Sequence, residues 1–280
     1  MLDVSSYLAR IGYSAGTQPT GETLCVLHRL HMMSVPFENL DISLGREIVA
    51  EEGAILKKVI GLRRGGFCYE LNGAFAALLR SLGFQVTLLS ARVARVNGGE
   101  GPEFDHLTLR VDLDEPWLAD VGFGESFLEP LRLKLGIEQL DPVGRFHLVQ
   151  DGGRWQMQKS EPDGGWKPQY SFSLQPRRLE EFAGMCLYHQ TSPDSSFTQK
   201  RICSRATPDG RITLSEMKLI VTHNGQRVER MLASEGEWLK TLEEQFRCPS
   251  LEARRTQTGR LIIFAIFGQR GLFLSPLETT

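Results

Sequence analysis

The spacing of the apolar residues changes near residue 84, from a helical period to a strand period. In segment 71–82, apolar residues recur every three or four positions along one helical face. In segment 106–113 they alternate with polar residues, as in a strand with one buried face. Helices followed by strands favour an α+β fold over a βαβ repeat. The residues involved are Leu71, Ala74, Phe75, Leu78, Leu79 and Leu82, then Leu107, Leu109, Val111 and Leu113.

Helical patterns dominate residues 1–83. Segment 25–33 has helical spacing, and its His28 and His31 are expected to be either hydrogen-bonded in the core or facing solvent. Pro36 interrupts the helices. Two later helices are predicted to end at glycines, because the residue just past a helix often adopts a left-handed conformation that glycine tolerates best. They are 51–61, ending at Gly61, and the helix that carries Cys68 and ends at Gly83.

Strand patterns follow, with two further helices among them. A Gly-Gly turn divides segment 145–158, and the turn residues Pro208, Asp209 and Gly210 divide 200–214, so both segments predict hairpins. The remaining predicted strands are 84–93, 106–113, 117–124, 170–174 and 260–267, and the predicted helices are 179–189 and 237–246.

Composition limits the classes of function. The net charge of −2 over 280 residues gives no reason to expect binding to nucleic acid or to anionic lipid. The chain contains no apolar run of about 18 residues and no basic, apolar leader, so neither a membrane span nor a signal peptide is expected. The five cysteines are scattered, which predicts a reduced, cytoplasmic protein with mostly buried thiols. CxxC, GxGxxG and P-loop patterns are absent, so we expect no metal and no phosphate loop.

Cys68 stands out because it begins a well-specified helix and follows Gly65-Gly66, which are expected to let the backbone approach a ligand closely. Free backbone N–H groups and the helix dipole favour a thiolate there, and Arg63 and Arg64 add positive charge. The sequence therefore predicts a lowered thiol pKa and an activated nucleophile, with N–H groups able to stabilise an oxyanion. The alternative is a core cysteine behind a glycine turn.

A nucleophilic cysteine needs a base and a group that orients the base. His106 begins the alternating strand, and Asp120 lies on the partner strand between two apolar residues. A regular hairpin would place Asp120 opposite Leu109, so contact with His106 would require a bulge or strong twist. The alternatives are that Asp120 caps the turn at Gly122–Gly124 and that His189 serves as the base.

Four motifs resemble the arylamine N-acetyltransferase family: VPFENLDI (35–42), RRGGFCYELNG (63–73), HLTLRVDL (106–113) with DVGFG (120–124), and SPDSSFTQ (192–199) with CSRATPDGRITL (203–214). The last 65 residues match weakly. The resemblance implies a catalytic triad of Cys68, His106 and Asp120, as in cysteine proteases. It also implies a helical bundle with the nucleophile over 1–84, a β-barrel with the histidine and aspartate over 85–190, and an α/β lid over 191–280.

The resemblance further implies a ping-pong transfer of an acetyl group. Acetyl-CoA, a co-substrate and not a bound cofactor, acetylates Cys68. The acetyl group then passes to the nitrogen of an arylamine or arylhydrazine, or to the oxygen of an N-hydroxyarylamine, as in xenobiotic metabolism. Glu38 is expected to pair with Arg64 and fix the loop before Cys68. The residues similar to the family's acceptor pocket, each of which could equally be plain core, are Phe37, Val93, Phe123, Gly124 and Phe197.

Three alternatives remain: a thiol hydrolase, a transglutaminase-like amide exchanger, and a binding protein with a relict site. The segment 94–105 is glycine-rich and acidic, which departs from some relatives and leaves the role of Glu103–Asp105 in the pocket open. The natural acceptor, the preferred acyl chain, the coenzyme A contacts and the oligomeric state cannot be read from the residues.

Overall fold

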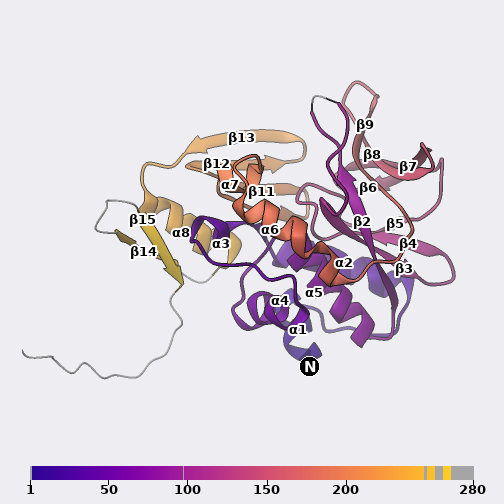
Figure 1. Ribbon diagram of the computed structural model, residues 1–280, viewed down its shortest axis with the longest axis horizontal. Coiled ribbons are helices and arrows are strands. Elements are labelled where there is room, and N and C mark those ends of the chain that lie inside the picture. The colour runs from indigo at the N-terminus through magenta and orange to yellow at the C-terminus, as the bar shows by residue number, and fades with distance from the viewer. Residues whose placement is uncertain (1, 97, 249–250, 256–260, 266–280) are drawn as a thin grey trace, which may run out of the picture.

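The computed structural model describes residues 2–96, 98–248, 251–255 and 261–265. Figure 1 shows the N-terminal helices gathered against a large sheet, with a second sheet to the side of both. The helices before residue 84 are α1 (Val4–Ile11), α2 (Gly21–Ser34), α3 (Leu40–Ser43), α4 (Glu52–Leu56), which continues as the π-helix η1 (Lys57–Gly61), and α5 (Cys68–Ser81).

Helix α5 is the centre of this helical layer. The sequence predicts one apolar face, yet every residue from Cys68 to Leu79 is buried. Helix α4 contacts α5, and strands β2 (Gln85–Val93) and β3 (His106–Asp112) cover it from the sheet. The helix begins where the Glu70 side chain accepts a hydrogen bond from the Phe67 N–H at 3.1 Å. Cys68 is therefore the first residue of a helix enclosed by other elements.

Eight strands of the described chain form one antiparallel sheet, in the order β5-β4-β3-β2-β9-β8-β7-β6. The Arg132 N–H of β5 donates to the Gln139 side chain of β6 at 2.7 Å, and the Gln139 amide donates back to the Arg132 carbonyl at 3.0 Å. These bonds link the edge strands, so the sheet is a nearly closed barrel. The remaining strands are β4 (Pro116–Ala119), β5 (Leu131–Arg132), β6 (Glu138–Asp141), β7 (Gly144–Asp151), β8 (Arg154–Ser160) and β9 (Trp166–Phe172).

The large sheet is apolar on both faces, because each face covers a different core. One face packs on α5 through Leu107, Leu109 and Val111, as their alternation predicted. The other encloses a second core around Leu89, Leu118, Phe127, Phe146, Tyr170 and Phe172. The turn between β7 and β8 has Gly152 and Gly153 at φ 52° and 80°, which confirms the predicted Gly-Gly hairpin.

A second sheet, in the order β1-β10-β11-β12-β13, joins a segment of the helical layer to four strands between residues 202 and 231. Its edge strand β1 (Phe37–Glu38) comes from the helical layer and pairs with β10 through Phe37 and Ser204. The predicted hairpin around Pro208 and Asp209 is confirmed, with Thr207 paired to Gly210. The other elements here are η2 (Leu179–Phe182), α6 (Ala183–Thr191), α7 (Ser196–Gln199), β10 (Ile202–Thr207), β11 (Gly210–Ser215), β12 (Lys218–His223), β13 (Gln226–Met231) and α8 (Glu235–Phe246).

The C-terminal strand prediction is confirmed within the described residues. Strand β15 (Leu261–Ala265) pairs with β14 (Leu251–Arg255), whereas Arg260 and residues 266–267 of the predicted strand lie outside the described part. None of the helices in the described ranges is long and apolar enough to cross a membrane.

Candidate active site

Cys68 is nearly buried, with 4% of its surface exposed, and it lines a cavity of about 980 Å³. The backbone of the preceding loop follows β1: Gly66 forms a bridge with Phe37, and the Glu38 N–H donates to the Gly66 carbonyl at 2.8 Å. The loop is thus added to the edge of the second sheet. This pairing brings Cys68 to the place where the helical layer and both sheets meet.

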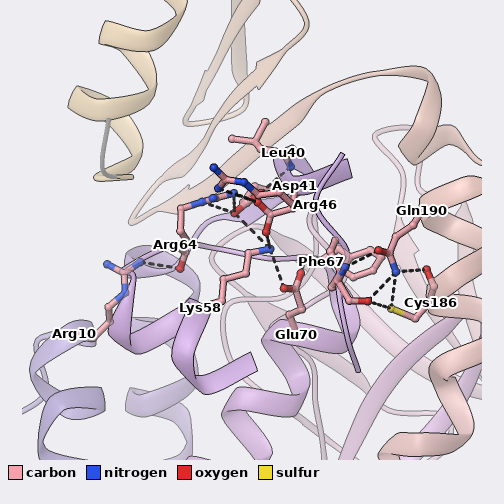
Figure 2. Close-up of polar contacts among 12 residues, drawn as sticks. Arg10, Leu40, Asp41, Arg46, Lys58, Arg64, Phe67, Glu70, Cys186 and Gln190 are labelled. Atoms are coloured by element: carbon pink, nitrogen blue, oxygen red, sulfur yellow. Dashed lines mark hydrogen bonds and ion pairs between the residues drawn. The ribbon is translucent and has the colours of Figure 1, made fainter. Parts of the chain in front are cut away.

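A cluster of charged side chains lies next to Phe67, the residue before Cys68, as Figure 2 shows. The predicted Glu38–Arg64 pair is present: Arg64 Nε and Nη2 lie 3.0 and 2.8 Å from Glu38 Oε1. Lys58 Nζ lies 2.7 Å from Asp41 and 2.8 Å from Glu70. Because Glu70 also accepts the Phe67 N–H, the cluster is connected directly to the start of α5.

Glycine is required at positions 65 and 66 for a different reason than the sequence suggested. We expected them to let a ligand approach, but a Cβ on Gly65 would overlap the Pro36 carbonyl. A Cβ on Gly66 would lie 2.6 Å from the Glu70 carboxylate. Both glycines therefore allow protein to pack against the loop, which fixes the backbone before Cys68.

His106 and Asp120 are in direct contact, because Nε2 of His106 lies 2.7 Å from Oδ2 of Asp120. Both side chains are buried. Burial raises the pKa of Asp120, but His106 and the hydrogen bonds from Asn72 and Gly122 outweigh it and hold the pKa below its ordinary value. The contact occupies Nε2, so Nδ1 is the ring nitrogen left for a proton from another group.

Two residues that the motif analysis did not assign hold Asp120. The Asn72 amide donates to Asp120 Oδ1 at 2.9 Å and to the Leu107 carbonyl at 2.6 Å. His28 Nε2 accepts the Asp120 backbone N–H at 3.1 Å, while its Nδ1 lies 2.8 Å from the Leu128 carbonyl. Asn72 lies in the ELNG part of a quoted motif, so its position was visible. His28 gave no signal, because its partners lie 92 and 100 residues away.

The burial of Cys68 works against the low thiol pKa that the start of the helix predicted. Burial raises the pKa well above its ordinary value, Asp120 and Asp105 raise it further, and a backbone hydrogen bond from Leu107 lowers it. The thiol therefore needs a proton acceptor. That backbone bond brings the sulfur next to the residue after His106, and both side chains line the same cavity.

All five predicted pocket residues line this cavity: Phe37, Val93, Phe123, Gly124 and Phe197. They are partly exposed and not closed core. The Phe37 and Phe197 rings lie 6.0 Å apart, and Phe123 packs edge-on against His106 at 5.2 Å. Gly122 is enclosed: a Cβ there would lie 2.8 Å from the Cys68 Cα. The wall next to Cys68 is thus aromatic and closely packed.

His189, the alternative base, lies in α6 and not in a loop. Its Nε2 is 3.2 Å from Asp105 Oδ1, and its Nδ1 is 3.2 Å from the Ser195 hydroxyl. Asp105 lines the cavity, whereas Glu103 turns to the ion pairs with Arg92 and Arg154 at 3.0 and 3.6 Å. In the part of the chain with described side chains, no group of three or more His, Cys, Asp or Glu is arranged to hold a metal ion.

Comparison with known proteins identifies the family. A family model described as N-acetyltransferase matches residues 20–254, which extends the weak match expected after residue 215. The pineal gland isozyme NAT-3 of arylamine N-acetyltransferase from Gallus gallus is 36% identical over 271 residues, covering 88% of this chain and 93% of that protein. This chain belongs to the arylamine N-acetyltransferase family.

Other members of the arylamine N-acetyltransferase family agree in sequence and in fold. A protein of Salmonella typhimurium named arylamine N-acetyltransferase / N-hydroxyarylamine O-acetyltransferase is 37% identical, covering 81% of each chain. The solved structure of the Mycobacterium marinum arylamine N-acetyltransferase in complex with CoA has a TM-score of 0.82 and 30% identity, covering 88% of this chain and 93% of that one. The family is one of acyltransferase enzymes.

Proposed function

We propose that this chain transfers an acetyl group from acetyl-CoA to the nitrogen of an arylamine or arylhydrazine, through an acetyl thioester on Cys68. The observation that carries the proposal is the common cavity of Cys68 and His106, with His106 held 2.7 Å from Asp120. The relative from Salmonella typhimurium is named as an N-hydroxyarylamine O-acetyltransferase as well, which supports N-hydroxyarylamine oxygen as a further acceptor. The CoA complex of the Mycobacterium marinum relative supports acetyl-CoA as co-substrate.

Deprotonation of Cys68 is the first step of the proposed reaction. Burial opposes a lone thiolate, so the proton passes to Nδ1 of His106 and leaves a thiolate–imidazolium pair. Asp120 stays ionised because its pKa is held low, and it stabilises the imidazolium through Nε2. Because these side chains are buried, the attraction between their charges is stronger than in water.

The two transfers use the same three side chains. The Cys68 thiolate attacks the thioester carbonyl, the bond to coenzyme A breaks, and the departing thiolate takes the imidazolium proton. An arylamine nitrogen then attacks the acetyl-cysteine carbonyl, and His106 accepts the amine proton. The Cys68 thiolate leaves as the amide forms. A cavity of about 980 Å³ lined by aromatic side chains is suited to an aryl ring.

The chain divides into three functional regions in this proposal. Residues 1–84 supply the nucleophile and its supporting cluster, residues 85–190 supply His106 and Asp120, and residues 191–280 act as an α/β lid. Strands β10–β13 line the cavity, which supports a lid role for the last region. All five cysteines are unpaired, which supports a reducing, cytoplasmic location.

Initial-rate kinetics test this function against the alternatives. With acetyl-CoA and 4-aminobenzoate varied together, we expect parallel double-reciprocal lines, since the two substrates bind to different enzyme forms. Release of coenzyme A should accelerate when the amine is added. Equally fast release in water alone would identify a hydrolase. An absence of release under both conditions would identify a binding protein.

A further inference from the structure

One wall of the cavity is a sheet face that the proposed chemistry does not use. Alternate residues of the strands β10–β13 point to it, and their cross-strand partners face the same way. The opposite face packs through Cys203 and Leu214 on helix α8, so the orientation of the sheet is fixed. The cavity-facing residues of these strands are Ile202, Ser204, Arg211, Thr213, Ser215, Ile220, Thr222 and Arg227.

Arg211 is a partly buried cation on this wall that lacks a carboxylate partner among the described residues. Its Nη1 donates to the Ser204 hydroxyl at 3.0 Å. The acidic groups that line the cavity are engaged elsewhere: Asp105 with His189, Glu125 with Lys159, and Asp209 with His223.

The negative charge around the Arg211 guanidinium does not offset the cost of burying its positive charge. Burial lowers the pKa of Arg211 to about 10, and Glu125 is the group that raises it. Glu125 is 77% exposed and lies 3.5 Å from Lys159, so it compensates little. Arg227, on the same wall, forms an ion pair with Glu229, with Nη2 2.6 Å from Oε1. A partly buried guanidinium with free donors favours an oxyanion, which it can bind through two hydrogen bonds.

A ladder of backbone pairs connects the loop before Cys68 to the strand that holds the Arg211 guanidinium. Gly66 bridges to Phe37, and Phe37 pairs with Ser204, which holds Arg211. Two strand spacings amount to roughly 10 Å. The Phe37 ring also lies next to Gly124: a Cβ on Gly124 would be 3.9 Å from that ring. The Cys68 loop and the strand that holds the guanidinium are thus separated by one strand, whose residue Phe37 lines the cavity.

We propose that Arg211 binds the carboxylate of an acidic arylamine whose amino group reaches the acetylated Cys68, so that the site prefers anionic acceptors. This inference rests on the proposed function. A phosphate of coenzyme A presents the same oxyanion chemistry. However, the whole pantetheine arm separates those phosphates from the thioester, whereas one aromatic ring separates the amine and carboxylate of an aminobenzoate. Because a single strand separates the loop before Cys68 from Ser204, the span fits the aminobenzoate better.

The test compares 4-aminobenzoate with its uncharged methyl ester. In Arg211→Gln, kcat/KM for the acid should fall roughly 10–100-fold, as expected for a lost charged hydrogen bond, while kcat/KM for the ester stays near wild type. Arg211→Lys should recover part of the loss, because lysine restores the positive charge but not the paired N–H donors of the guanidinium. Arg227→Gln is the matched control and should leave the ratio unchanged. Equal losses for acid and ester, or none for either, would overturn the proposal.

A second arm separates the two sources of oxyanion. Single-turnover acetylation of Cys68 is measured with acetyl-CoA and with S-acetylpantetheine, which lacks the phosphates. We expect Arg211→Gln to acetylate at the wild-type rate with both donors. A slower reaction with acetyl-CoA alone would assign Arg211 to a coenzyme A phosphate and overturn the acceptor assignment. Failure of the wild-type protein to acetylate at all would instead refute the proposed function.

Discussion

Asp120 lies 2.7 Å from His106 although the two residues are not cross-strand partners. Strand β3 pairs with β4 through Leu109 and Ala119, which is one residue from the expected register, and β4 ends there. Asp120 follows as the first residue beyond the strand, diagonal to His106. The contact needs no bulge, because the chain leaves the sheet at Asp120 and Asn72 and Gly122 hold its carboxylate.

Replacing Asp120 with Asn should remove most of the activity and preserve the fold. Asn can keep one hydrogen bond to His106, but it cannot stabilise an imidazolium, so kcat should fall by about 10³–10⁴-fold. The measurement is kcat beside the far-UV circular dichroism spectrum. A folded variant with near-wild-type kcat would reduce Asp120 to a cap of the 122–124 turn.

His28 should affect catalysis through Asp120. His28→Phe leaves the buried Asp120 N–H and Leu128 carbonyl unpaired, which costs about 1–3 kcal/mol for each group. We expect a lower unfolding free energy and slower transfer from acetyl-Cys68 to the amine. His28→Gln, which retains a donor and an acceptor, should recover part of both. Unchanged transfer in folded His28→Phe would limit His28 to packing.

The pH profile of Cys68 alkylation should depend on His106. In the wild-type protein, iodoacetamide should react with Cys68 at about pH 6, well below the ordinary thiol pKa of about 8.5, because His106 accepts the proton. In His106→Gln, burial keeps the pKa raised, so the reaction should require alkaline pH. Peptide mapping distinguishes Cys68 from the partly exposed Cys25. Superimposable profiles would show that His106 does not activate the thiol.

The contribution of Glu70 to stability should fall as pH rises toward neutrality. Burial raises the Glu70 pKa from 4.5 to about 7 in the folded state. A folded pKa above the unfolded one means that the folded state binds the extra proton, so its stabilising effect is lost as pH rises from about 4.5 to 7. Urea unfolding at about pH 5 and pH 8 measures this loss. Glu70→Gln should show a smaller difference; an equal one would assign the effect to other groups.

Local patterns predicted the elements that are stabilised locally. The switch of period at residue 84, the Gly152-Gly153 turn and the turn at Pro208-Asp209 all lie where the sequence indicated. These features depend on neighbouring residues, so their signal is contained in a short window.

Features that depend on distant partners were not predictable from such windows. Strand β1 has two residues and exists because β10 pairs with it from more than 160 residues away. The pKa of Cys68 was expected to fall because the helix start was visible, while the elements that bury it were not. His28 likewise became informative only once α2 packed against the Asp120 turn.

The central claim is that Cys68 carries an acetyl group between two substrates, and intact-protein mass spectrometry tests it most directly. After brief incubation with acetyl-CoA, the wild-type protein should gain the mass of one acetyl group, mapped to Cys68, and lose it when an arylamine is added. Cys68→Ala should gain none. Acetylation elsewhere, persistence of the adduct in the presence of the amine, or turnover by Cys68→Ala would contradict the covalent mechanism.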